Sequence, residues 1–178
     1  VAKIVDPESG GARSPGENGL LLVKGPGRMI GYLNDSTRTA ETFRDGWYVT
    51  GDIATIEQDG FIRITDRLAR FSKIGGEMVP HTKVEEFIAQ LPGVAACAVT
   101  AVADPQKGEK LIVFYVSDDG IEPGAIWQSL SGTEMPRLWL PKQQSICRVD
   151  DLPRLATGKL DLQVIKQMAR DHLPATPQ

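Results

Sequence analysis

The feature that most constrains the fold is an Asp59-Gly60 pair that lies between two β-favouring runs, "WYVTGDIATIEQ" and "FIRITDR". An Asp-Gly pair in this setting is typical of a β-hairpin, because glycine readily adopts the positive φ angles that a tight turn needs. The sequence therefore predicts an antiparallel hairpin that turns at residues 59–60.

The character of the chain changes directly after this hairpin. Before it, an apolar run at 19–25 predicts a strand, and Asp35 or Ser36 is placed to cap a short helix. After Arg67, the stretch "LARFSKIGGEMVP" has no sustained period and predicts a hinge, a short strand and a turn. Further elements are predicted in this order: a helix at 82–91, strands at 94–102 and 110–117, a short helix at 125–130, a strand at 144–149 and a helix at 160–173.

The helix at 82–91 carries the clearest local pattern. Thr82 and Glu85 have the spacing of a capping box, in which each side chain bonds to the backbone of the other residue. The apolar side chains of the helix repeat at the spacing of one helical face; they are Val84, Phe87, Ile88 and Leu91. This face is expected to pack on the core.

These elements predict an α+β chain of two parts. Residues 1–68 form a β-rich part, and residues 69–178 form a compact domain with a roughly three-stranded sheet and two to three helices. The chain begins at Val1 with a loop-like "DPESGGARSPGENG", from which we expect a piece of a larger protein.

The net charge, the longest apolar runs and the cysteines limit the partners and the compartment that the sequence predicts. The net charge of −3 and the pI near 5.4 give no general attraction to nucleic acid or to anionic membranes, so no nucleic-acid partner is expected. No apolar run approaches the roughly 20 residues that span a bilayer. Cys97 and Cys147 have no CxxC or Cys/His cluster around them, which favours free thiols in a reducing, cytoplasmic compartment.

A Gly-Lys pair stands near the end of the chain, in "LPRLATGKLD". A phosphate-binding P-loop would need a glycine five positions before Gly158 and Ser or Thr after Lys159, and the chain has Pro153 and Leu160 there. Any phosphate chemistry at Lys159 therefore belongs to another framework.

Three spaced elements suggest that framework: "GWYVTGD" at 46–52, "DRLARFSKIGGEM" at 66–78 and "LPRLATGK" at 152–159. In this order they resemble the adenylate-forming superfamily of acyl-CoA synthetases, luciferases and peptide-synthetase adenylation domains. The resemblance covers nearly the whole chain. It implies that residues 1–68 are the end of a large AMP-binding domain and that residues 69–178 are a small mobile C-terminal domain.

The resemblance also implies roles for individual residues. Lys159 matches the catalytic lysine, which stabilises negative charge as a carboxylate joins the α-phosphate of ATP. Asp52 matches the aspartate that accepts hydrogen bonds from both ribose hydroxyls, and Arg67 matches an arginine that contacts ribose or phosphate. From local sequence alone, Asp52 is equally well a turn residue, and a surface charge at a strand end is a strong alternative for Arg67. For Lys159, local sequence without the other two elements favours a solvated lysine at a helix entrance.

The hinge of the family corresponds here to Leu68 and Ala69. The family commonly has Asp or Lys at the second position, so Ala69 changes the hinge side chain while leaving the backbone free to rotate. The next segment matches a loop that serves thioester formation after the small domain turns; its residues are Lys73, Gly75, Gly76 and Glu77. A plain tight turn is the alternative for the glycine pair.

The hinge region is most similar to the synthetase portion of bacterial bifunctional 2-acylglycerophosphoethanolamine acyltransferase/acyl-ACP synthetases. This similarity implies an acyl-ACP synthetase of phospholipid acyl recycling, acting on fatty acids at the cytoplasmic face of the inner membrane. Its acceptor would be the phosphopantetheine arm of an acidic acyl carrier protein. Such a partner fits a positive patch of Arg67, Arg70, Lys73 and Lys83, although four solvated charges are an equal alternative.

The resemblance implies ATP and Mg²⁺ for the full-length parent and no cofactor for this piece alone, which lacks the glycine- and Thr/Ser-rich phosphate loop and is expected to be inactive. Two alternatives stay open: an acyl-CoA synthetase, with coenzyme A as acceptor, and a non-catalytic module that docks a carrier protein. His81 and His172 have no ligand-spaced partner, so no metal site is predicted. The absence of GxSxG gives no support to a Ser/His hydrolase.

Overall fold

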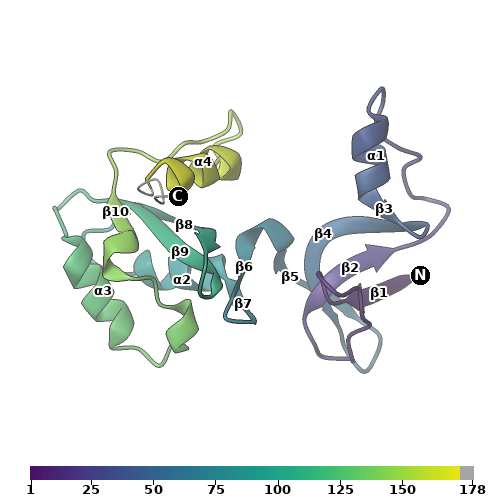
Figure 1. Cartoon of the computed structure of the whole chain (residues 1–178), viewed down its shortest axis with the longest axis horizontal. Helices are drawn as coiled ribbons and strands as arrows, with labels where there is room; N and C mark the ends of the chain where they lie inside the picture. Colours follow the sequence, from purple (N-terminus) through teal and green to yellow (C-terminus); the bar gives the residue numbers. More distant parts are fainter. Residues whose placement is uncertain (173–178) are drawn as a thin grey trace. The chain divides into compact units, whose positions relative to one another are not determined.

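The computed structural model describes residues 1–172, and the chain divides into two compact units after Ala69 (Figure 1). The predicted boundary lies one residue earlier, between 68 and 69. Each unit has its own sheet and its own core.

The first unit is built mainly of strands. Its elements are β1 (Ala2–Val5), β2 (Gly19–Val23), α1 (Ser36–Thr42), β3 (Phe43–Arg44), β4 (Trp47–Ile56) and β5 (Ile62–Arg67). The strands form one antiparallel sheet in the order β1-β2-β4-β3, with β5 paired to β4. The Asp35 side chain accepts a hydrogen bond from the Arg38 N–H at 2.9 Å and caps α1, so one of the two predicted caps is confirmed.

The predicted hairpin is confirmed. Strands β4 and β5 pair antiparallel around the turn at residues 57–61, where the Glu57 N–H donates to the Phe61 carbonyl at 2.9 Å. Gly60 has a φ of +88°, the left-handed conformation that glycine adopts without steric cost.

A 3₁₀ turn (Leu68–Arg70) spans the boundary between the two units. Within the described residues, the elements of the second unit are β6 (Phe71–Ile74), β7 (Glu77–Pro80), α2 (His81–Ile88), β8 (Ala96–Asp104), β9 (Gly108–Val116), α3 (Pro123–Ser131), 3₁₀ turns (Arg137–Trp139 and Gln143–Ser145), β10 (Ile146–Arg148) and α4 (Leu162–His172). The sheet has the order β10-β9-β6-β7, with β8 paired to β9. Only β10 runs parallel to its neighbour.

The α+β class is confirmed, but the second sheet has five strands where roughly three were expected. The additional strands, β6 and β7, lie in the segment predicted as a hinge with one short strand. Each has four residues, which is too short for an alternating pattern to stand out in the sequence.

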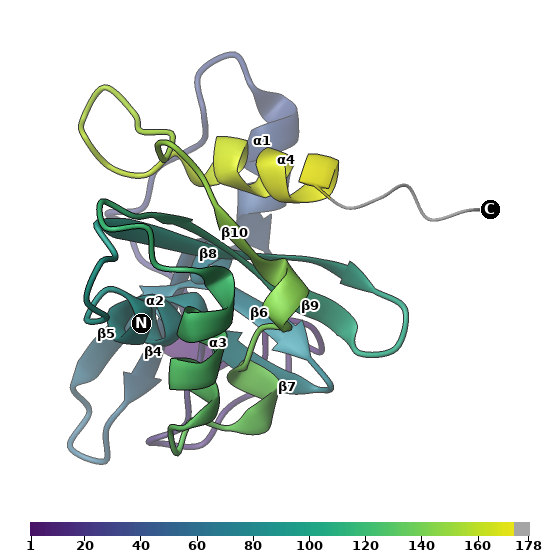
Figure 2. The same cartoon turned by 90° about the vertical axis from the view of Figure 1, so that its left-hand side faces the viewer.

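Helices cover both faces of this sheet (Figure 2). On one face α2 and α3 bury Val84, Ile88 and Ile126 against Val113 and Tyr115 of β9. On the other face α4 buries its own apolar stripe against the sheet; the residues buried there include Ala98, Ile112, Phe114, Ile165 and Ala169. Because β8 and β9 are buried on both faces, their sequences are continuous apolar runs without alternation.

Helix α2 differs from its prediction at its beginning. It starts at His81, one residue before the predicted position, and its N-cap is Pro80 without a side-chain cap. Thr82 therefore lies inside the first turn, and the predicted capping box is wrong. The Glu85 side chain accepts a hydrogen bond from the Val99 N–H of β8 at 2.6 Å.

None of the helices within residues 1–172 is both long enough and apolar enough to cross a membrane.

Candidate functional site

Asp52 and Arg67 lie opposite each other on the β4–β5 hairpin. The Arg67 Nε lies 2.9 Å from the Asp52 Oδ1, and the Arg67 Nη1 donates to the Thr50 carbonyl at 3.2 Å. The Asp52 side chain is 18% exposed and that of Arg67 is 66% exposed. The pair therefore presents one half-buried carboxylate beside a solvent-facing guanidinium, a combination suited to hydroxyl donors and to an anion.

A register shift creates this pairing. Ala54 pairs with Ile64, but Ile53 pairs with Asp66, so Thr65 is an additional residue on β5. The Thr65 hydroxyl donates to the Ile53 carbonyl at 3.1 Å across the irregularity. With the register of Ala54 and Ile64 continued, Asp52 would lie opposite Asp66, and two carboxylates would repel.

Lys159 lies in a tight hairpin loop just before α4. Arg154 and Leu160 form an isolated antiparallel bridge, the Gly158 N–H donates to the Leu155 carbonyl at 2.8 Å, and the Leu155 N–H donates to the Lys159 carbonyl at 2.8 Å. Gly158 has a φ of +80° with open space where a Cβ would stand, so the turn conformation, not crowding, calls for glycine. The Lys159 side chain is left exposed at the tip.

The loop that carries Lys159 is joined closely to α4. The Asp161 side chain accepts hydrogen bonds from the Gln163 N–H at 3.1 Å and the Val164 N–H at 3.2 Å, which satisfies free donors of the first helical turn. The Asp161 N–H donates to the Pro153 carbonyl at 2.8 Å. Because α4 is buried on the sheet through Ile165, the backbone under Lys159 is held by a packed element.

The segment predicted to serve the thioester step is the turn between β6 and β7. Lys73 and Glu77 lie on the two strands, and Gly75 and Gly76 form the turn with φ angles of +59° and +89°. A Cβ on Gly75 would lie 3.4 Å from a methyl carbon of Leu138. Both glycines are exposed.

Residues that were not predicted hold this turn in place. The Glu109 carboxylate accepts a hydrogen bond from the Lys73 N–H at 2.7 Å, and the Gly75 N–H donates to the Lys107 carbonyl at 2.8 Å. Both partners belong to the β8–β9 turn region, more than 30 residues further along the chain. The "DPQKG" turn signal marked this region in the sequence, but nothing local indicated which strand it supports.

We expect Glu109→Ala to lower the free energy of unfolding by about 1 kcal/mol, because the Lys73 N–H loses a charged acceptor that is partly screened by solvent. Urea unfolding of the chain measures this change. Glu134→Ala, which removes an exposed carboxylate from the same unit, is the matched control and should leave the unfolding midpoint unchanged. Equal effects of the two substitutions would contradict a supporting role for Glu109.

The predicted basic patch is not supported. Arg70 forms an ion pair with Glu85, and the Lys83 Nζ lies 2.8 Å from a Glu86 carboxylate oxygen. A third member, Arg67, is already paired in the β4–β5 hairpin. The sequence shows where cations stand but not the acidic side chains that the fold places beside them.

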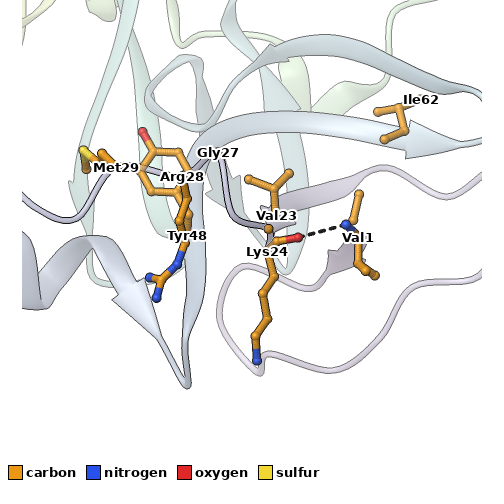
Figure 3. A pocket seen from close by; sticks show the side chains of 10 residues that line it. Val1, Val23, Lys24, Gly27, Arg28, Met29, Tyr48 and Ile62 are labelled. Carbon is orange, nitrogen blue, oxygen red and sulfur yellow. Dashed lines mark hydrogen bonds between the residues drawn. The ribbon is translucent and has the colours of Figure 1, made fainter.

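A pocket with a volume of about 720 Å³ lies in the first unit (Figure 3). Its walls include the apolar side chains of Val23, Met29 and Ile62, and Lys24 and Arg28 also line it. None of the residues predicted for the functional site lines this pocket.

Both histidines have partners within the second unit. The His81 Nε2 lies 2.6 Å from the Ser72 Oγ in the core, and the His172 Nε2 lies 3.1 Å from the Cys147 Sγ. In the described part of the chain, no three His, Cys, Asp or Glu side chains are grouped to hold a metal ion.

Comparison with known proteins relates this geometry to a family. Residues 83–159 match the family model "AMP-binding enzyme C-terminal domain". A feruloyl-CoA synthase of Amycolatopsis is 38% identical over 154 residues, covering 85% of this chain and 31% of that protein. A 2-succinylbenzoate–CoA ligase of Listeria innocua is 32% identical, covering 85% of this chain and 32% of that protein.

The fold agrees with solved structures of the same group. The ATP-bound MatB from Rhodopseudomonas palustris is 32% identical, with a TM-score of 0.79 over 96% of this chain and 34% of that protein. The chain therefore spans about a third of the length of these relatives.

The chain belongs to the adenylate-forming superfamily and corresponds to its C-terminal AMP-binding region. Within that superfamily, residues 83–159 are an AMP-binding enzyme C-terminal domain, and the named relatives are CoA synthases and ligases.

Proposed function

We propose that this chain is the C-terminal part of an ATP-dependent acid–thiol ligase that transfers an acyl group to coenzyme A. In the first half-reaction a carboxylate oxygen attacks the α-phosphorus of ATP and pyrophosphate leaves. In the second, a thiol sulfur attacks the acyl carbonyl, AMP leaves with the bonding electron pair, and the thiol proton passes to solvent. ATP supplies the leaving group that makes the carboxyl carbon reactive.

Lys159 has the properties that the first half-reaction needs. Its ammonium is exposed on a long side chain, whereas its backbone is held by the Arg154–Leu160 bridge and by α4. A lysine with a fixed backbone and a mobile ammonium can approach the negative charge that develops between carboxylate and phosphate. In the same step, Asp52 would accept the ribose hydroxyls and Arg67 would contact ribose or phosphate.

The two half-reactions would use two separate segments of the second unit. The loop of Lys159 and the Gly75-Gly76 turn stand at different ends of this unit in both views (Figures 1 and 2). One orientation of a rigid unit would present the lysine to a site, and another would present the glycine turn. We propose that Leu68 and Ala69 supply the rotation between them.

Large apolar side chains on the first unit support a covering domain outside this chain. Ile30 is 98% exposed, Leu33 91% and Phe61 74%. We propose that the remainder of a large adenylation domain packs on this unit and brings the acyl pocket, the phosphate loop and the ligands for Mg²⁺.

The names of the relatives favour coenzyme A over acyl carrier protein as the acceptor. The resemblance of the hinge segment to acyl-ACP synthetases remains the reason to test the carrier protein. A docking module without catalysis is disfavoured by the exposed Lys159 and by the Asp52–Arg67 pair, which a docking surface would not require.

The test is product formation by the full-length enzyme with ATP, Mg²⁺ and a panel of aromatic and aliphatic carboxylic acids, with coenzyme A or holo-acyl carrier protein offered separately. We expect a thioester on coenzyme A and none on the carrier protein, and neither product from the 178-residue chain alone. Product on the carrier protein alone would establish the acyl-ACP alternative. Neither adenylate nor thioester with any acid would refute the ligase proposal.

A further inference from the structure

The junction between the two units is bounded on each side by an arginine. The chain divides after Ala69, and a single 3₁₀ turn (Leu68–Arg70) forms the connection. Arg67 comes before this connection and pairs with Asp52 of the first unit. Arg70 is the first residue of the second unit and pairs with Glu85 of that unit.

The Arg70–Glu85 pair is buried. The side chains are only 13% and 14% exposed, in contrast to the 66% of Arg67. Burial raises the pKa of the nearby Cys97 thiol to about 12, with the Glu85 charge as a further cause, which indicates a low-dielectric surrounding. A charge left in such a place without its partner is costly, so separation of the pair is unfavourable.

Glu85 also joins the pair to the core of the unit. One carboxylate oxygen pairs with Arg70 and the other accepts the Val99 N–H of β8 at 2.6 Å. The Glu85 carbonyl accepts a hydrogen bond from the Cys97 thiol at 3.4 Å. One glutamate on α2 therefore connects the start of β6 to β8, the strand that is buried on both faces.

We propose that the Arg70–Glu85 pair holds the chain in place from Arg70 onward. The pair would thereby fix the beginning of β6 to α2 and limit the junction between the units to the residues before Arg70. Rotation between the units is then confined to Leu68 and Ala69. On the side of the first unit, Arg67 is held by its ion pair with Asp52, which is weaker because Arg67 is exposed. Since β6 leads directly into the Gly75-Gly76 turn, this boundary also sets the position of that turn.

Amide hydrogen exchange of the 178-residue chain tests the proposal. In Arg70→Gln we expect exchange of the amides at 70–74 to rise by about tenfold or more, while exchange of the α4 amides changes by less than about twofold. The matched control is Lys83→Gln, which breaks the ion pair with Glu86 on the same helix, where both side chains are 59% exposed. This control should leave the amides at 70–74 unchanged.

Two outcomes would overturn the proposal: unchanged exchange at 70–74 in Arg70→Gln, or an equal rise there and in α4, which would indicate a general loss of stability. If Arg70→Gln does not fold, Arg70→Lys keeps the charge but loses the planar fork of the guanidinium. We expect a smaller rise in the lysine variant, confined to the same amides, and its absence would also overturn the proposal.

The consequence for catalysis rests on the proposed function. In the full-length enzyme, Arg70→Gln should slow thioester formation by about tenfold and change adenylate formation by less than about twofold, because only the second step uses the glycine turn. If Arg70→Gln changes amide exchange but not the rate of thioester formation, the structural role of the Arg70–Glu85 pair stands and the role of the glycine turn in thioester formation is refuted. Amide exchange therefore tests the Arg70–Glu85 pair, and the thioester rate tests the role of the turn independently.

Discussion

Replacement of Lys159 by alanine is expected to slow adenylate formation by the full-length enzyme by about 10²–10³-fold, the usual loss when one group that stabilises transition-state charge is removed. The physical reason is the position of the side chain, which is exposed at the tip of a loop whose backbone is fixed by its own hydrogen bonds. Pyrophosphate exchange measures this step directly.

The same substitution should leave folding intact. Lys159 is exposed, and the turn depends on Gly158 and on backbone bonds. The thermal midpoint of Lys159→Ala should therefore equal that of the unaltered chain. Lys166→Ala, on the exposed face of α4 seven residues later, is the control and should affect neither property. Near-normal pyrophosphate exchange in Lys159→Ala would remove this residue from the proposed mechanism.

Replacement of Asp52 by asparagine is expected to weaken binding of AMP to the full-length enzyme by roughly 10- to 100-fold, the effect of losing charged hydrogen bonds to two hydroxyls. Asparagine has the same shape but offers only one acceptor oxygen and no charge. Isothermal titration calorimetry gives the affinity. Deoxy analogues of AMP should bind the unaltered enzyme as weakly as AMP binds the variant.

Stability should change little in Asp52→Asn. The Arg67–Asp52 pair is largely exposed on the arginine side, and such pairs contribute about 0–1 kcal/mol. Asp59→Asn, in the turn of the same hairpin, is the control and should leave AMP binding unaltered. Weaker binding in both variants would point to a disturbed hairpin and not to a ribose contact at Asp52.

Local patterns predicted the elements of the second unit well where they were long. The apolar stripe of α2 does face the core through Val84 and Ile88, and the runs at 94–102 and 110–117 are strands. The cap of α2 was mispredicted because the helix begins at His81 with Pro80 as its N-cap, so Thr82 lies within the first turn. Strands β6 and β7 were only partly anticipated, since four residues each carry too little periodicity.

In the candidate site too, some features follow from local sequence and others depend on residues far away in the chain. Lys159 was proposed from a motif that includes Gly158, and Gly158 does adopt the positive φ for which glycine is suited. Asp52 and Arg67 were each proposed by resemblance, but their contact depends on the additional residue Thr65 in β5. Glu109 was not found, because its role is set by a strand 36 residues earlier.

The sequence alone determined the β4–β5 turn, the Asp35 cap of α1 and the apolar face of α2. These depend on backbone preferences and side-chain spacing within a few residues. Only the tertiary structure decided which charges pair, which strand register brings Asp52 to Arg67, and which turn supports Gly75. Those outcomes depend on contacts between residues far apart in the chain, and their energies arise only when packing excludes water from both partners.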